Sequence, residues 1–302
     1  MARYGVIDLG TNTFHLLIVE VQADGKLVKL HKERKYVSLA EESIHRIGDA
    51  AFQRAQDSIL YFAQVLKSYE VKHVKAFGTS ALRNASNASD LIQSIFEKTG
   101  IQIEVISGIA EANFIHKGVK QVVPFDDSIS LIMDIGGGSV EFILCDSEQV
   151  LWSNSFRIGV AVLYNNFHLE EPMTAASREK LQAFLEAQLA PLRKALQTYP
   201  PNQIIGASGT FDVLVNLLES QRISKFHAQL DPMDILQWGQ SIKGLTLEER
   251  LAIPDLPTQR ASLIVVAVEL LEYVIQLANP DYISVSSFAM KEGIISEMAQ
   301  NF

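Results

Sequence analysis

Residues 131–146 read LIMDIGGGSVEFILCD, and this stretch determines how the rest of the chain is interpreted. An apolar run ends at Asp134, glycines follow at 136–138, and a second apolar run comes next. Because glycine lacks Cβ and tolerates positive φ, the backbone N–H groups of such a turn can approach an anion closely. A carboxylate beside a phosphate-binding turn indicates a hard cation that bridges carboxylate and phosphate oxygens. The pattern predicts a strand, a phosphate-binding turn and a second strand, with Asp134 and Glu141 as oxygen ligands of the cation.

The same pattern occurs again near the N-terminus, where VIDLGTNTF at residues 6–14 matches IMDIGGGSV at residues 132–140 position by position. Asp8 corresponds to Asp134 at a constant offset of 126 (134 − 8). An internal repeat of this length predicts two domains of the same architecture, whereas a single copy is equally typical of an ordinary glycine turn between buried strands. The candidate phosphate ligands in the two turns are Gly10, Thr11, Asn12 and Thr13, and Gly136, Gly137, Gly138 and Ser139.

Three further segments place polar residues after predicted strands, where open α/β sheets bind ligands. Arg83 follows strand 73–77, and its planar guanidinium suits phosphate oxygens, although a surface salt bridge is the alternative. Glu111 follows strand 102–106 and opens a helix, where the helix dipole alone also favours an acidic residue. Strand 203–207 meets a third glycine and hydroxyl turn, which is typical of an anion site and of an ordinary helix N-cap alike. The candidate ligands in that turn are Ser208, Gly209 and Thr210.

The composition argues against several classes of protein. The 302 residues allow about two domains, and a net charge of −9 argues against a general binder of nucleic acids. The single cysteine, Cys145, excludes an internal disulfide and indicates a reducing compartment. The N-terminus lacks the apolar region of a signal peptide, and the apolar stretch at 263–278 is short for a bilayer and carries two glutamates. We therefore expect a cytoplasmic protein with neither a membrane nor a nucleic acid as partner.

The repeat also sets the expected domain boundary, near Pro124. It gives an N-terminal domain of residues 1–124 and a C-terminal domain of residues 125–302, with a last helix at about 290–302 that packs back on the first domain. The seven histidines show no metal-ligand spacing, and no Ser/His/Asp grouping or P-loop lysine motif occurs. Zinc chemistry and acyl transfer therefore lose support.

Two longer elements are expected from periodicity and charge. Apolar residues at spacings of three and four predict one long helix from Thr174 through Leu196, ended by Pro200. The cation-rich strand at 27–38 either guides a polyphosphate or, as we favour, protects a sheet edge from pairing with another chain.

Five motifs together resemble those of the exopolyphosphatase and guanosine pentaphosphate phosphohydrolase family, within the superfamily of actin, sugar kinases and heat-shock chaperones. The resemblance covers essentially the full length, and the motifs occur in the family's order. It implies an α/β protein with a duplicated ribonuclease-H-like (actin-like) fold, two lobes and an active site in the interlobe cleft. The motifs are residues 7–14, 78–83, 107–112, 134–141 and 208–210.

The resemblance also implies a role for each candidate residue. Glu111 matches the family's catalytic base, and Arg83 matches a ligand of the substrate phosphate. Three carboxylates, those of Asp8, Asp134 and Glu141, match the residues that organise magnesium (or manganese) and the attacking water. The turns at 10–13, 136–139 and 208–210 match phosphate-binding loops.

The chain departs from the family pattern at four positions. Ala110 precedes Glu111 where relatives often have two adjacent glutamates, and Val140 replaces a threonine. Ser262 and Lys291 replace an aspartate and an arginine. The chain also stops without the helical domains that longer members append, so we expect a preference for short polyphosphates or distributive release. A homodimer is a further expectation.

The sequence thus predicts a magnesium-dependent phosphohydrolase that releases terminal orthophosphate from inorganic polyphosphate, with guanosine pentaphosphate as the alternative substrate. Two other classes stay open. An actin-fold kinase needs adenine and acceptor sites, which no segment clearly provides. A non-catalytic sensor of polyphosphate or nucleotide is disfavoured because all four carboxylates are retained.

Overall fold

The computed structural model describes residues 2–22, 26–207 and 209–300. The predicted turn at residues 23–25 and the candidate phosphate ligand Ser208 lie outside the described residues.

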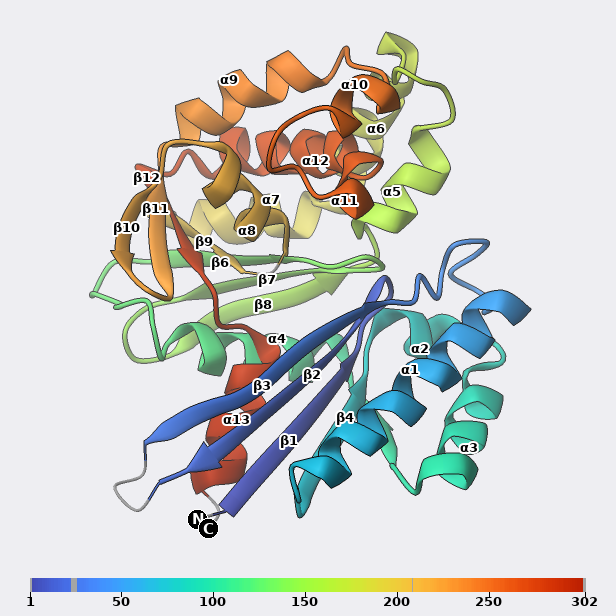
Figure 1. Cartoon of the computed structure of the whole chain (residues 1–302). Helices are drawn as coiled ribbons and strands as arrows, with labels where there is room; N and C mark the ends of the chain where they lie inside the picture. The colour runs from blue at the N-terminus through green and yellow to red at the C-terminus, as the bar shows by residue number, and fades with distance from the viewer. Residues whose placement is uncertain (1, 23–25, 208, 301–302) are drawn as a thin grey trace. The chain divides into compact units, whose positions relative to one another are not determined.

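The chain divides into two compact units. Unit 1 comprises Met1–Gly118 and Met290–Phe302, and unit 2 comprises Val119–Ala289 (Figure 1). The boundary that the repeat suggested, at residue 124, therefore falls inside unit 2.

Unit 1 contains a five-stranded sheet with the order β3-β2-β1-β4-β5. Strands β1, β2 and β3 pair antiparallel, whereas β4 and β5 add to β1 in parallel. The cation-rich strand β3 lies at the edge of this sheet, where lysine side chains discourage pairing with another chain. The strands are β1 (Ala2–Leu9), β2 (Thr13–Val21), β3 (Leu27–Tyr36), β4 (His73–Gly78) and β5 (Ile103–Val105).

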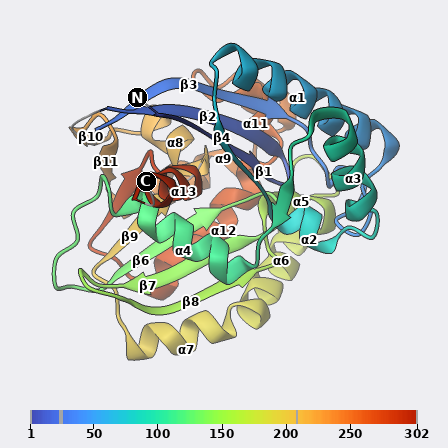
Figure 2. The same cartoon turned by 90° about the horizontal axis from the view of Figure 1, so that it is seen from below.

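Helices cover both faces of this sheet. Helices α1 and α3 pack together on one face, and α13 lies along β1 and β2 on the other (Figures 1 and 2). The backbones of α13 and α4 are in close contact, since a Cβ on Gly293 would overlap the carbonyl oxygen of Phe114. The helices of unit 1 are α1 (Asp49–Ser68), α2 (Ser80–Asn84), α3 (Ala88–Thr99), α4 (Gly108–Val119, which ends at the unit boundary) and α13 (Met290–Gln300).

Unit 2 contains a seven-stranded sheet with the order β10-β11-β12-β9-β6-β7-β8. Counted from its β8 edge, the first five strands run β8-β7-β6-β9-β12 and repeat the order and directions of unit 1. The prediction of a duplicated α/β, actin-like fold is thereby confirmed. The strands are β6 (Ser130–Ile135), β7 (Val140–Cys145), β8 (Val150–Phe156), β9 (Gln203–Ala207), β10 (Gln221–Ser224), β11 (His227–Leu230) and β12 (Tyr282–Ser286).

The helices of unit 2 gather on one face of its sheet (Figure 1). Helix α12 lies at the centre of this layer and is buried along most of its length. Its two glutamates, Glu269 and Glu272, are paired with Lys243 of the neighbouring segment, which offsets part of the cost of burying their charges. The helices are α5 (Val160–Phe167), α6 (Ala175–Gln188), α7 (Ala190–Thr198), α8 (Gly209–Leu217), α9 (Pro232–Ile242), α10 (Leu247–Leu251), α11 (Thr258–Ala261) and α12 (Ile264–Ala278).

The prediction of one long helix from Thr174 was wrong, because the segment forms α6 and α7 with a break at Leu189. Pro191 lies in the first turn of α7, where its missing N–H is harmless, whereas inside a continuous helix its ring would clash with a carbonyl group of the preceding turn. The polar segment after β4 contains the five-residue helix α2. This helix is too short to show a hydrophobic periodicity in the sequence.

None of the helices in the described part of the chain has the length and apolarity needed to cross a membrane.

Candidate active site

Both repeat turns close with the same hydrogen bond. The amide of Gly10 donates to the carbonyl of Thr13 at 3.1 Å, and the amide of Gly136 donates to the carbonyl of Ser139 at 3.0 Å. A Cβ on either glycine would lie 2.8 Å from that carbonyl oxygen. Glycine is therefore required at both positions by the closeness of the turn itself.

The first turn, at residues 10–13, is oriented by amides that follow strand β3. Amides of residues 37–39 donate to the carbonyl groups of Thr11 and Asn12 at distances of 2.7 to 3.0 Å. In a planar trans peptide the C=O points one way and the N–H of the next residue points the other way. The N–H groups of Asn12 and Thr13 are thus directed away from residues 37–39, as an anion site requires.

Helix α5 orients the second turn in the same way. The amides of Val160 and Ala161, in the first turn of α5, donate to the carbonyls of Gly136 and Gly137 at 3.0 and 2.9 Å. The N–H groups of the next residues, Gly137 and Gly138, therefore point away from α5. Each copy of the repeat thus presents two consecutive amides in one direction, which is the geometry of a phosphate or other anion cradle.

One hydroxyl in the first turn lacks a partner. The side-chain oxygen of Thr11 is buried and forms no hydrogen bond, a rare situation among the described residues. A buried hydroxyl without a partner is destabilising unless a ligand or water satisfies it. This observation favours a bound polar group at the turn.

Two carboxylates lie side by side at the second turn, Asp134 before it and Glu141 after it. In the antiparallel pairing of β6 and β7, Asp134 lies directly opposite Glu141, so the two side chains share one face with their Cβ atoms about 5 Å apart. Oε1 of Glu141 accepts hydrogen bonds from the hydroxyls of Ser139 and Ser155, each at 2.7 Å. Asp8 holds the corresponding position in unit 1, where it lies opposite His15.

This pair of carboxylates fits a magnesium ion. Magnesium in phosphate-processing sites is usually held by one or two carboxylates plus substrate oxygens, not by a cage of protein ligands. No cluster of three or more His, Cys, Asp or Glu side chains suited to a metal occurs among residues 2–22, 26–207 and 209–300.

Glu111 and Arg83, which follow neighbouring parallel strands, meet at the carboxyl edge of the unit 1 sheet. Nη1 of Arg83 donates to Oε2 of Glu111 at 2.7 Å and to the carbonyl of Ile106 at 3.0 Å. The hydroxyl of Ser107 accepts from the amide of Ala110 and so fixes the start of α4. Glu111 is nearly buried, with 9 % exposed. The arrangement holds a carboxylate in one orientation beside a cation.

The third turn, at the start of α8, is contacted by an arginine that the sequence analysis did not single out. Gly209 and Thr210 are buried at the helix N-terminus. The guanidinium of Arg260, from α11, lies directly against Gly209, since a Cβ on that glycine would overlap it. Arg260 follows Pro254 and Pro257 and precedes the long apolar run of α12. This isolated cation was the signal in the sequence that could have identified it.

Residues 17–302 match the family model described as the Ppx/GppA phosphatase family. The chain belongs to this family. An exopolyphosphatase from Cytophaga hutchinsonii, known from its crystal structure, is 40% identical with a TM-score of 0.94, and the match covers 99% of this chain and 98% of that one. A Ppx/GppA family member from Aquifex aeolicus, 23% identical over 99% of this chain and 98% of that one with a TM-score of 0.80, shares the fold.

The curated relatives of the Ppx/GppA family are longer proteins. The guanosine-5'-triphosphate,3'-diphosphate pyrophosphatase of Vibrio vulnificus is 29% identical over 309 aligned residues, which cover 98% of this chain and 59% of the relative. The chain therefore spans about three-fifths of the length of the curated relatives that it matches.

Gly159 is a second residue that the sequence did not single out in this Ppx/GppA chain. A Cβ at this position would lie 2.4 Å from the carbonyl carbon and oxygen of Gly137. The glycine therefore allows α5 to approach the turn at residues 136–139. This contact joins segments that are separate in the sequence, so residue spacing does not reveal it.

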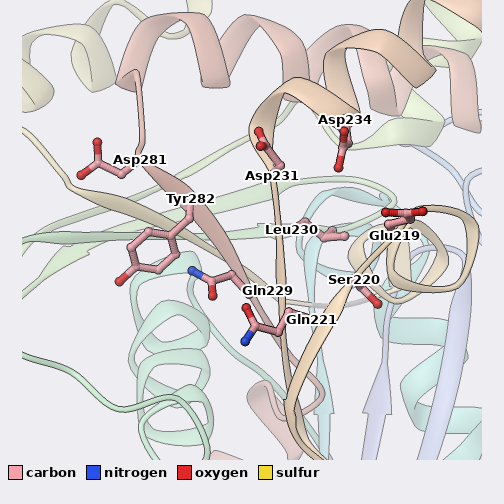
Figure 3. Close-up of a pocket in the computed structure, with 9 residues that line it drawn as sticks. All are labelled: Glu219, Ser220, Gln221, Gln229, Leu230, Asp231, Asp234, Asp281 and Tyr282. Atoms are coloured by element: carbon pink, nitrogen blue, oxygen red, sulfur yellow. The ribbon is translucent and has the colours of Figure 1, made fainter.

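One cavity of the described residues is not suited to a polyanion. It has a volume of about 470 Å³ and lies at the amino end of β12, whereas the turns of β6 and β9 lie at the carboxyl ends of their strands. Figure 3 shows acidic side chains from several elements around it. Phosphates would be repelled by its four carboxylates, those of Glu219, Asp231, Asp234 and Asp281.

Cys145 is not a candidate nucleophile for phosphate chemistry. It is a free, buried thiol, and burial raises its pKa to about 12. A thiol with so high a pKa is not ionised near neutral pH and is a poor nucleophile.

Proposed function

We propose that this protein hydrolyses phosphoanhydride bonds and releases the terminal orthophosphate of inorganic polyphosphate, with magnesium (or manganese) as cofactor. The observation that carries the proposal is the duplicated turn. In each copy, two consecutive amides point in the same direction, and an aspartate lies just before the turn. Polyphosphate offers a chain of anionic oxygens to such amides and to a cation between carboxylate and phosphate. The 40% identity to a protein described as an exopolyphosphatase supports the same substrate.

Each residue group has a distinct role in this reaction. The amides of Asn12 and Thr13 and those of Gly137 and Gly138 bind phosphate oxygens. Gly209 and Thr210 at the start of α8, together with Ser208, form the third phosphate-binding turn. Glu111 accepts a proton from the attacking water, and its bond to Arg83 orients the carboxylate. Arg83 then neutralises charge on the phosphate as it approaches.

Asp134 and Glu141 would hold the cation, and Asp8 is the further candidate from unit 1. A divalent cation at this place supplies charge neutralisation on the phosphate oxygens. The two hydroxyls on Oε1 keep Glu141 in one orientation, so that its carboxylate is set before the substrate arrives.

Orthophosphate release from tripolyphosphate, measured with and without magnesium, tests the proposal. The expected result is release that requires magnesium and stops with a chelator. Transfer of phosphate from ATP to an added sugar would favour the kinase, and binding without any release would favour the sensor.

Replacement of Asp134 by asparagine is expected to raise the half-saturating magnesium concentration by at least about tenfold, because an amide carries no charge to hold the cation. A magnesium titration of the initial rate measures this. Asp281→Asn, at the other end of the sheet, makes the same change of charge and should leave the titration unaltered. An unchanged midpoint in Asp134→Asn would remove this residue from the metal site.

Guanosine pentaphosphate is the second candidate substrate, and one cavity favours it. A space of about 280 Å³ lies beside α8, within about one helical turn of Thr210. Its apolar side chains suit a flat base and its polar ones suit a base edge and further phosphates, a mixture that a bare phosphate chain does not need. Those side chains are Val215, Ala228 and Val285, and Asp212, Asn216, Arg222 and Lys225. The curated relatives named as guanosine-5'-triphosphate,3'-diphosphate pyrophosphatases support the same alternative.

The variant Asn216→Ala tests whether the cavity beside α8 binds the nucleoside of guanosine pentaphosphate. If the cavity takes the nucleoside, kcat/KM for guanosine pentaphosphate should fall roughly tenfold, the size of one or two lost hydrogen bonds, while that for tripolyphosphate stays constant. Equal values for both substrates in the variant and the wild type would exclude the cavity as a nucleoside site.

A further inference from the structure

The two copies of the repeat place different side chains opposite their aspartates. Asp8 lies opposite His15 in unit 1, and Asp134 lies opposite Glu141 in unit 2. Both partners occur at the same offset of 126 (141 − 15), so histidine takes the place of glutamate at the equivalent position of the repeat.

In each copy, the last hydroxyl of the turn bonds to this differing residue. Oγ1 of Thr13 lies 3.0 Å from Nε2 of His15, and the hydroxyl of Ser139 donates to Oε1 of Glu141 at 2.7 Å. A hydroxyl has one proton to donate and can accept further hydrogen bonds. The partner therefore decides whether that proton is available to a ligand.

Glutamate and imidazole place opposite demands on the hydroxyl. A carboxylate only accepts, so the proton of Ser139 is committed to Glu141. An imidazole that is protonated at Nε2 donates instead, which leaves the proton of Thr13 free to point elsewhere. The exposed fractions of the two residues agree with this difference. Ser139 is 3% exposed, whereas Thr13 is half-buried and can be reached by a ligand.

We propose that the two turns have different tasks: His15 donates through Nε2 to Thr13, so that the Thr13 hydroxyl donates to a substrate phosphate, whereas the Ser139 hydroxyl serves Glu141 and does not bind phosphate. His15 is thus a positioning residue of the first turn. This inference rests on the proposed function, since it assigns the phosphate contact within the same site. The amides of Gly137 and Gly138 keep their role toward phosphate.

The test begins with a matched pair of variants at the equivalent hydroxyls, Thr13→Val and Ser139→Ala. Binding of tripolyphosphate is measured by calorimetry in the presence of a chelator, so that neither turnover nor the cation contributes. Thr13→Val should weaken binding roughly 10- to 100-fold, the size of one hydrogen bond to a charged group. Ser139→Ala should change it less than about threefold. Equal losses in the two variants would overturn the proposal.

A double-mutant cycle then tests the part played by His15. His15→Glu copies the arrangement of unit 2 and should capture the Thr13 proton, whereas His15→Gln keeps an N–H donor and should recover most of the lost affinity. Added negative charge alone also weakens binding of a polyanion, but that effect persists in the Thr13→Val background. The loss caused by His15→Glu should therefore be about tenfold smaller in that background. Equal losses in both backgrounds would show that only charge matters and would refute the role of His15.

Two further readouts separate positioning from folding and from the proposed function. With saturating magnesium, Thr13→Val should raise KM and leave kcat nearly constant, because the contact is the same in the bound and transition states. A fall in melting temperature that parallels the loss of affinity would identify a structural role and overturn the inference. If the wild-type protein binds no tripolyphosphate in the chelator and releases no orthophosphate from it with magnesium, the proposed function fails together with the inference. If it releases orthophosphate with magnesium but the binding losses are additive, or binding without the cation is absent, the inference alone is defeated.

Discussion

Replacement of Glu111 by glutamine is expected to lower kcat for orthophosphate release by roughly 10²- to 10⁴-fold, the usual cost of losing a general base. The amide keeps the shape of the side chain and can still accept the N–H of Arg83, which donates to Glu111 at 2.7 Å. It cannot take up a proton from water. KM and the melting temperature should therefore change little, and initial rates at several substrate concentrations measure the difference.

Glu104→Gln provides the matched control for this prediction. Glu104 lies in the neighbouring strand β5 with its side chain exposed, so the same change there should leave kcat intact. Turnover within a few-fold of wild type in Glu111→Gln would mean that another group accepts the proton.

Replacement of Gly159 by alanine should lower kcat/KM by about 100-fold, although no atom of this residue is expected to touch the substrate. The new Cβ would lie 2.4 Å from the carbonyl group of Gly137, so the phosphate-binding turn or α5 has to shift by about 1 Å. Displacements of this size at a reacting centre cost about two orders of magnitude in rate.

Gly244→Ala is the control, because a Cβ there meets nothing within 4 Å. It should leave both kcat/KM and the melting temperature near wild type. If Gly159→Ala unfolds the protein, loss of activity carries no information, so the melting temperature is measured first. A folded Gly159→Ala protein with normal kcat/KM would show that the turn at residues 136–138 tolerates displacement and is not the phosphate cradle.

The duplicated fold could be predicted because its evidence is local and occurs twice. The repeat at Asp8 and Asp134 lies on a strand, a glycine turn and a second strand, and both the turn and the strand pattern follow from residue spacing alone. Residue spacing also predicted that Arg83 and Glu111 follow two parallel strands. Their direct pairing required the adjacent positions of β4 and β5 in the sheet, which spacing does not reveal.

The features that were missed depend on contacts between distant segments or on short elements. Gly159 and Arg260 were missed because they lie against Gly137 and Gly209, which are separate from them along the chain. Helix α5 and the strands β10 and β11 have at most eight residues each, too few for a convincing period. The break at Leu189 was overlooked because the apolar spacing continues through it, although Pro191 was a sufficient signal.

Hydrolysis in water enriched in oxygen-18 tests the central claim most directly. Tripolyphosphate is incubated with the protein and magnesium, and the isotopic content of both products is measured by mass spectrometry. If water attacks the terminal phosphorus, each released orthophosphate carries one oxygen-18 atom, the pyrophosphate carries none, and Glu111→Gln forms neither product at a comparable rate. The account would be contradicted by label in the pyrophosphate, or by no labelled orthophosphate above that of the Glu111→Gln variant.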